Sequence, residues 1–269
     1  MDLHLKDHVV VITGGASGIG RATAIAFAGE GAHIAVWDLP DHAKRAAAEI
    51  SAATSARALG IPVDIADESA VYIATAHTLE AMGRIDHLVH AAAIGSGKFG
   101  FPFTNLQPQD WPRVMQVNVM GMVHVAHAVA PHLIERKAGS MVFVASVAGQ
   151  IGSQTDPPYS ASKAANINFA QCLAKDLAPH GVRINTVCPG MVQTPLNRLV
   201  WQAWHDQAPP AERLPYEEWS ERKIRAVVPL GKWQTPQAIA DMIVFLSSDR
   251  AAHVTGQTIN VDGGFVMHW

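Results

Sequence analysis

The chain has 269 residues, of which 49% are hydrophobic and 16% are charged, and its formal net charge is −3. This length suits one large α/β unit with a well-buried core. The acidic balance argues against nucleic acid or an anionic membrane surface as the main partner. The two cysteines, Cys172 and Cys188, lack the spacing of a disulfide framework or zinc site. We therefore expect a reducing, cytoplasmic compartment.

The amino terminus reaches an apolar run almost at once, which leaves no room for a signal peptide. No run of 18 apolar residues occurs, so we predict no membrane span. The most apolar long segment, residues 117–134, contains three histidines. We interpret it as a buried or interface helix.

Short apolar runs alternate with helical segments along the chain. Val9–Ile12, bounded by glycine, is typical of a strand buried on both faces. Further strands are predicted at 33–37, 58–63, 87–91, 141–145, 183–187 and 258–261, and helices at 18–29, 41–53, 68–82, 109–136, 159–177 and 237–247. This alternation predicts right-handed crossovers and a mainly parallel sheet with helices on both faces. No linker or fixed repeat is visible, so we expect a single domain over residues 1–269.

The segment 195–229 interrupts this regularity. It holds three prolines near its middle together with Trp201, Trp204, Tyr216 and Trp219. Connections of this length inside a compact domain are usually functional. We interpret the segment as a partly helical lid, whose aromatic residues either stack on a substrate or pack the lid down.

A glycine-rich stretch follows the first predicted strand and opens the first helix. Glycines in this context permit a tight turn and a close approach of the backbone to a pyrophosphate, which then sits at the helix amino end. The stretch predicts a dinucleotide site at Gly14, Ser17, Gly18, Ile19 and Gly20.

Asp38 ends the second predicted strand, where a carboxylate can accept hydrogen bonds from a ribose diol and repel a 2′-phosphate. Neither Leu39 nor Ser17 is basic, so the expected cofactor is NAD rather than NADP. Asp64 follows the third strand, with Ile65 after it, and two interpretations stay open: contact with the adenine amino group, or a cap for the next helix.

Tyr159 and Lys163 lie four residues apart in a predicted helix and therefore share one face. A free phenol has a pKa of about 10. An ammonium group beside it favours the phenolate. We expect Lys163 to lower the pKa of Tyr159 so that the phenol can exchange a proton with an alcohol or carbonyl near neutral pH.

Taken together, these motifs resemble those of the short-chain dehydrogenase/reductase family. The resemblance covers nearly the whole chain and includes Asn118, Ser146, Pro189-Gly190 with Thr194, and the ending Thr-Gly-Gln-Thr-Ile-Asn-Val-Asp-Gly-Gly. It implies a Rossmann-like, doubly wound α/β fold with a seven-stranded sheet in the order 3-2-1-4-5-6-7. It also implies a homotetramer or homodimer, in which the long helix pairs with its copy.

The resemblance implies a catalytic tetrad. Tyr159 would be the acid or base, Lys163 would bind the nicotinamide ribose, Ser146 would bind the substrate oxygen, and Asn118 would hold a water beside Lys163. Pro189, Gly190, Val192 and Thr194 would bracket the nicotinamide. Ala91 and Ala92 are expected beside the cofactor, in a turn where the family's Asn-Asn-Ala-Gly is replaced by His90-Ala91-Ala92-Ala93. We expect His90 to take over a structural hydrogen bond.

The expected activity is that of an NAD-dependent oxidoreductase which interconverts a secondary alcohol and a ketone. Gln150, Gln154 and Gln193 flank the pocket motifs, and with lid stacking they favour a polyol, a sugar or another polar hydroxy compound. A hydrophobic cyclic or aryl alcohol is the alternative substrate. A regulatory subunit that binds NAD without chemistry is the alternative function. His124 and His127 share a helix face, but no third ligand is evident in the sequence, and we expect an interface or core role rather than a metal.

Overall fold

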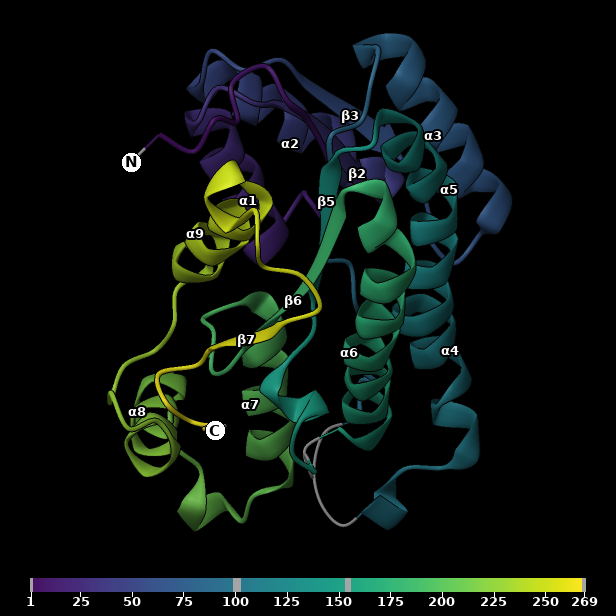
Figure 1. Ribbon diagram of the computed structural model, residues 1–269. Helices are drawn as coiled ribbons and strands as arrows, with labels where there is room; N and C mark the ends of the chain where they lie inside the picture. Colours follow the sequence, from purple (N-terminus) through teal and green to yellow (C-terminus); the bar gives the residue numbers. More distant parts are fainter. Residues whose placement is uncertain (1, 99–102, 153–155, 268–269) are drawn as a thin grey trace.

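A seven-stranded sheet lies at the centre of the computed structural model, which describes residues 2–98, 103–152 and 156–267 (Figure 1). The strand order is β3-β2-β1-β4-β5-β6-β7, and all neighbouring strands are parallel. This confirms the predicted order. The strands are β1 (Val9–Thr13), β2 (His33–Asp38), β3 (Ala58–Pro62), β4 (His87–His90), β5 (Gly139–Val144), β6 (Val182–Pro189) and β7 (Thr258–Val261).

Helices cover both faces of this sheet. They are α1 (Gly18–Gly29), α2 (Pro40–Ala53), α3 (Glu68–Met82), α4 (Pro112–Met115), α5 (Gly121–Arg136), α6 (Pro157–Leu177), α7 (Pro195–Gln207), α8 (Tyr216–Val227) and α9 (Pro236–Ser247). The predicted helix 109–136 is divided, because a π-helical turn at Gln116–Met120 separates α4 from α5. In this wider turn the amide of Gly121 donates to the carbonyl of Gln116, five residues back.

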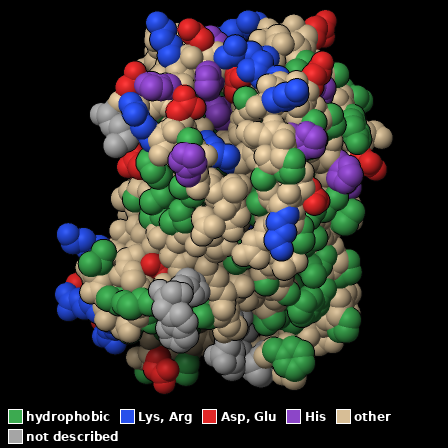
Figure 2. Space-filling view, in the orientation of Figure 1, with side chains coloured by type: hydrophobic (Ala, Val, Ile, Leu, Met, Phe, Trp, Pro, Cys, Tyr) green, Lys and Arg blue, Asp and Glu red, His purple; other side chains and the backbone are tan. Residues whose placement is uncertain are grey.

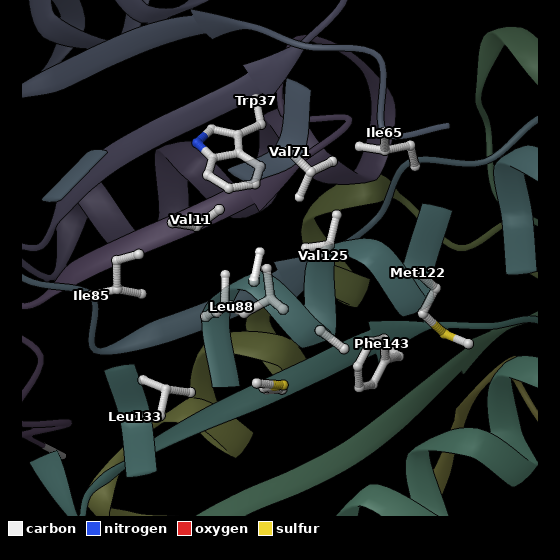
Figure 3. Packing of buried hydrophobic residues seen from close by; sticks show 14 of the residues in the cluster. Val11, Trp37, Ile65, Val71, Ile85, Leu88, Met122, Val125, Leu133 and Phe143 are labelled. Carbon is white, nitrogen blue, oxygen red and sulfur yellow. The ribbon is translucent and has the colours of Figure 1, made fainter. Parts of the chain in front are cut away.

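Successive strand residues point to opposite faces, so the sheet divides the core in two. Val11 and Trp37 contribute to one cluster with α3, α5 and α6, and Figure 3 shows them packed toward Val125 of α5. Val10 and Val36 point the other way, into a cluster with α1, α2 and α9. Burial on both faces explains why these strands are continuous apolar runs rather than alternating ones.

Local sequence sets the ends of several helices. The Asp67 carboxylate accepts from the Ala70 amide at the start of α3, and Gly83 ends that helix in the left-handed region at φ 80°. At the start of α6, the Asp156 carboxylate accepts from the Tyr159 amide, and Pro157 occupies the first helical position. Asp156 therefore fixes where the helix that carries Tyr159 and Lys163 begins.

The helical run Pro108–Arg136 is long and apolar enough to cross a membrane by length and composition alone. In the structure it is a core helix, because Met122, Val125 and Leu133 are fully buried in the cluster beneath the sheet (Figure 3). Its apolar character is therefore explained by packing, in agreement with the interpretation of a buried helix.

Parallel strands bring their carboxyl ends to one edge of the sheet. The loops after β1, β2, β4, β5 and β6 meet there, although they are far apart in the sequence. The segment between β6 and α9 forms α7 and α8, which extend beyond this edge (Figure 1).

Candidate active site

The loops at the carboxyl ends of the strands enclose a cavity of about 680 Å³. Its wall contains Ser146, Tyr159 and Lys163 and every residue that the sequence predicts for the cofactor. The latter are Gly14, Ser17, Gly18, Ile19, Gly20, Asp38, Leu39, Asp64, Ile65, Ala91, Ala92, Pro189, Gly190, Val192 and Thr194, together with Tyr159 and Lys163. One cavity therefore joins the predicted nucleotide site to the predicted proton-transfer residues.

The glycine loop is built for close backbone approach. Gly14 has φ +66°, and a Cβ there would lie 2.8 Å from the Ala92 amide nitrogen. A Cβ on Gly20 would clash with the Gly14 carbonyl. The first turn of α1 faces the cavity without a side-chain cap from Ser17 and without an acidic residue. Uncapped N–H groups at a helix amino end are suited to a phosphate group.

Asp38 lies at the end of β2 and its carboxylate accepts two backbone N–H groups. One comes from Leu39 at 2.8 Å, and the other comes from Ala16 of the glycine loop at 3.0 Å. Asp38 thus ties β2 to the loop after β1 while it faces the cavity. Its remaining lone pairs are available to a diol.

Asp64 lines the same cavity, and the structure distinguishes its two interpretations. Asp67, not Asp64, caps α3. The Asp64 carboxylate instead accepts from the Ala66 amide at 2.9 Å and lies 3.4 Å from the Arg113 guanidinium. The helix-cap interpretation is therefore wrong, while contact with an adenine group stays a prediction.

Tyr159 and Lys163 lie on one face of α6, as their spacing predicts. The Lys163 ammonium lies 5.5 Å from the centre of the Tyr159 ring and donates to the Val144 carbonyl at 2.7 Å. Lys163 is buried, whereas Tyr159 is partly exposed to the cavity. Ser146 stands at the start of a short 3-10 turn after β5, where its hydroxyl accepts from the Ala148 amide.

In the protein without cofactor, the pKa of Tyr159 is raised, although the sequence predicts a lowered value. Burial raises the pKa of Tyr159 to about 12, with a smaller opposing contribution from its hydrogen bond to Ser146 and a further increase from the Asp156 charge. Burial also lowers the pKa of Lys163 to about 8. The pKa of Tyr159 is therefore shifted opposite to the expected direction in the protein alone, because desolvation dominates.

Asn118 sits in the π-helical turn and is fully buried. Its side chain exchanges two hydrogen bonds with the backbone of Ile94, both at 2.9 Å, and donates to the Ser162 hydroxyl. The backbone carbonyl of Asn118 accepts from the side-chain amide of Asn166 at 2.9 Å. Asn118 does not line the cavity but joins the loop after β4 to α6, beside the turn that carries Lys163.

His90 makes the structural hydrogen bond expected of it. Its Nδ1 lies 3.0 Å from the Thr13 hydroxyl, which links β4 to β1 beneath the cavity. Burial lowers the pKa of His90 to about 3, and the Lys163 charge acts in the same direction. The imidazole is therefore neutral at physiological pH. Elsewhere, His124 is partly buried with its Nδ1 3.0 Å from the Ile65 carbonyl, whereas His127 is exposed.

The residues predicted to recognise substrate are placed differently. Gln150 donates to Asn260 at 2.7 Å and does not line the cavity; Gln193 does not line it either. Gln154 lies outside the described residues. The lid aromatics, Trp201, Trp204, Tyr216 and Trp219, pack on one another with ring centres 5.8 to 6.2 Å apart. They do not line the described cavity, so they pack the lid down rather than stack on a substrate.

Three charged residues of the cavity wall were not anticipated: Asp156, Lys223 and Arg113, the last of which pairs with Asp64. Asp156 is buried, accepts from the Ser96 amide at 2.8 Å, and lies close enough to Tyr159 to raise its pKa. The Asp-Pro-Pro sequence before Tyr159 is a helix-start signal that could have indicated its position. Lys223 of α8 also lines the cavity. The sequence gives no comparable signal for Lys223, because the docking of α8 decides which of its faces turns inward.

Comparisons with known proteins agree with this geometry. A family model described as enoyl-(acyl carrier protein) reductase matches residues 14–266. The short-chain dehydrogenase fogB of Aspergillus ruber is 37% identical, over 95% of this chain and 96% of that protein. D-threitol dehydrogenase of Mycolicibacterium smegmatis is 32% identical, over 99% of this chain and 95% of that protein. The structure of L-sorbose reductase from Gluconobacter frateurii, in complex with NADPH and L-sorbose, matches with a TM-score of 0.91 at 27% identity over 100% of both chains.

Proposed function

The chain belongs to the short-chain dehydrogenase/reductase family. Because its relatives include a D-threitol dehydrogenase and an L-sorbose reductase, we propose that it interconverts a secondary alcohol and a ketone with NAD. The proposed substrate is a polyol, a sugar or another polar hydroxy compound. One observation carries the proposal: Tyr159, Ser146 and Lys163 share a cavity with the glycine loop and Asp38.

The residues present fit a nicotinamide dinucleotide. The uncapped amino end of α1 would hold the pyrophosphate, and Asp38 would hold the adenosine ribose through its diol. Pro189, Gly190, Val192 and Thr194 would hold the nicotinamide. When bound, this cofactor supplies the hydride chemistry. The Asp38 charge supports NAD over NADP, because a 2′-phosphate would meet a carboxylate; the related L-sorbose reductase structure, by contrast, contains NADPH.

Proton transfer falls to Tyr159 in this proposal. In ketone reduction the phenol would donate its proton to the substrate oxygen, and in alcohol oxidation the phenolate would accept it. Ser146 would hydrogen-bond the same oxygen and stabilise its developing charge. At neutral pH the phenol of Tyr159 is protonated, which is the form that donates in ketone reduction. Lys163 would orient the nicotinamide ribose, and Asn118 would position α6 and a water beside Lys163.

Support for a polar substrate comes from the relatives and from the cavity wall. The related proteins include a D-threitol dehydrogenase and an L-sorbose reductase. Polar groups of Ser146, Asp156 and Asn197 line the cavity and can bind hydroxyls. The cavity wall also contains apolar side chains, which would suit the alternative substrate, a hydrophobic cyclic or aryl alcohol. These residues are Met191, Leu196, Val200, Val227 and Phe265.

We further propose that residues 1–269 form one catalytic unit and that 195–229 acts as its lid. Pro195, Asn197 and Val200 of α7 and Lys223 of α8 line the cavity, so movement of these helices would change access to it. Two hydrogen bonds connect this part of the chain. The Tyr216 hydroxyl donates to the Asn197 side-chain oxygen, and the Trp201 indole N–H donates to the Leu214 carbonyl. These contacts tie α7 to α8 and to the segment just before it.

The proposed assembly is a homotetramer or homodimer in a reducing, cytoplasmic compartment. Cys172 and Cys188 are both free thiols, which is compatible with such a compartment. Exposed apolar side chains on α3 and on the helical run before α5, Ile73 and Met120, would be covered by a second subunit.

The test is turnover of NAD with a panel of secondary alcohols, followed by absorbance of the reduced nicotinamide. The panel holds polyols (threitol, xylitol, glucitol) and hydrophobic alcohols (cyclohexanol, 1-phenylethanol). We expect a polyol to be oxidised. Tyr159→Phe should lower kcat/KM by about a thousandfold, because general acid–base groups contribute about 10² to 10⁴. NAD binding by the variant should change far less than its turnover.

Tyr72→Phe is the matched control, since this tyrosine is exposed on α3 away from the cavity. Undiminished turnover in Tyr159→Phe would contradict the mechanism. Oxidation of the hydrophobic alcohols alone would establish the alternative substrate. Tight NAD binding without turnover of any alcohol or ketone would favour a regulatory NAD-binding subunit.

A further inference from the structure

Lys223 is a cation of the lid that lines the cavity. It lies on α8, and its neighbours one turn away on the same face are Trp219, which is buried, and Val227, which also lines the cavity. The Lys223 side chain is partly buried, with its ammonium 4.7 Å from the centre of the Trp219 ring. This is its one described contact with an oppositely charged or electron-rich group.

The other basic residues of α8 are arranged differently. Arg222 pairs with Glu218, and Arg225 pairs with Glu221, each four residues apart on the exposed side of the helix. Figure 2 shows basic side chains at the outer edge of the molecule where Figure 1 places α8. Lys223 therefore stands apart: it is turned inward, and no carboxylate of the described residues pairs with it.

The remaining charges of the cavity are already satisfied. Asp64 pairs with Arg113, Asp38 and Asp156 accept backbone amides, and Lys163 donates to Val144. Burial lowers the pKa of Lys223, and no charged group of the described chain contributes to that shift. A desolvated ammonium without an anionic partner is unfavourable, and an anion brought by a ligand would relieve that cost.

We propose that Lys223 binds an anionic group of the substrate, a carboxylate, sulfonate or phosphate, while Tyr159 and Ser146 act on its hydroxyl or carbonyl. The proposal rests on the proposed function and narrows it to acidic polyhydroxy compounds. α8 lies well apart from α6, which carries Tyr159 (Figure 1). The anionic group and the reacting carbon would therefore be bound by residues of two different helices of the cavity wall.

The experiment compares matched pairs that differ in one terminal group: D-gluconate with D-glucitol, D-xylonate with xylitol, and D-threonate with D-threitol. Binding is measured by calorimetry on the Tyr159→Phe protein saturated with NAD, so that turnover is negligible during the titration. At least one acid should bind about tenfold or more tighter than its neutral partner, because a charge-assisted hydrogen bond in a partly desolvated site is worth that factor.

Three substitutions at α8, each made in the Tyr159→Phe protein, separate the charge from the packing. Lys223→Met keeps the length and the contact with the Trp219 ring but should abolish the preference for the acid. Lys223→Arg keeps the charge and should retain most of the preference for the acid. Arg222→Met removes the same charge from the exposed side of the same helix and should leave the preference unchanged. Lys223→Gln serves in place of Lys223→Met if the latter does not fold, as judged by circular dichroism.

Equal binding of acid and neutral partner in all three pairs would overturn the proposal, as would an acid preference that survives in Lys223→Met. These outcomes are distinct from a failure of the proposed function. Binding is measured with negligible turnover, whereas the proposed function fails only if the wild-type protein oxidises none of the alcohols and reduces none of the corresponding ketones.

Discussion

Asp38 shows how one side chain serves both the fold and the choice of cofactor. Its carboxylate holds the Ala16 amide of the glycine loop at 3.0 Å and faces the cavity at the end of β2. The cavity wall offers no basic residue next to it in the chain, since Trp37 and Leu39 flank it. A 2′-phosphate at this place would be repelled by the Asp38 carboxylate.

Asp38→Asn is expected to weaken the discrimination between the two cofactors. Asparagine keeps an oxygen that can accept from Ala16 but removes the charge. NADP should bind about tenfold tighter than to the wild type, and NAD should change less. Fluorescence titration with each cofactor measures both constants. Asp41→Asn, an exposed acidic residue of α2 outside the cavity, is the control. Wild-type protein that binds NADP as tightly as NAD would refute the role given to Asp38.

At the scale of an element, α7 is the least anchored helix next to the site. None of its residues, Pro195–Gln207, is fully buried. By contrast, α9 buries Ile239, Ile243, Val244 and Leu246 against the sheet. Segments with few buried contacts open locally at low free-energy cost, and ligand-binding lids are usually drawn from them. α8 is held better, through buried Trp219 and Ile224.

Hydrogen exchange should therefore detect α7 as the mobile part of the lid. Without ligand, its amides should exchange faster than those of α9. With NADH and substrate bound, α7 should become protected by about tenfold or more, because Asn197 and Val200 line the cavity and gain contacts there. Protection of α9 should not change. If α7 is as protected as α9 before any ligand is added, the lid proposal is wrong.

At the scale of the whole molecule, two buried imidazoles of β4 link stability to pH. Burial lowers the pKa of His87 to about 3, with the charge of His8 acting in the same direction, and burial likewise lowers the pKa of His90 to about 3. The ordinary value is 6.5. Between pH 6.5 and 3 the unfolded chain therefore binds more protons at these sites than the folded protein, so stability falls as the pH falls through this window.

Each of these histidines should contribute a slope of up to about 1.4 kcal/mol per pH unit to the free energy of unfolding. His90→Asn removes one contribution, and asparagine can still donate or accept toward Thr13. The variant should lose stability less steeply between pH 6.5 and 4 than the wild type, as measured by urea denaturation at several pH values. His253→Asn, at an exposed position, should keep the wild-type slope. Parallel curves for His90→Asn and wild type would contradict this assignment.

The sequence by itself determined the order of the strands and most helices, and it indicated the central residues of the proposed site. Strands that are buried on both faces consist mainly of continuous apolar residues, as in Val9–Thr13. A glycine loop between a strand and a helix is recognisable because its backbone geometry requires glycine at particular positions. The spacing of Tyr159 and Lys163 fixes their common face wherever the helix lies. Short-range patterns such as these do not depend on the docking of distant elements.

Only the tertiary structure decided the environments of these groups. The phenol of Tyr159 is desolvated by residues from several elements, which reversed the expected direction of its pKa shift. Gln150 bonds to Asn260, 110 residues away, instead of facing the cavity. The docking of α8 turned Lys223 inward and its neighbouring arginines outward. Burial, pairing and the direction of a side chain follow from contacts between distant segments, and local sequence does not encode those contacts individually.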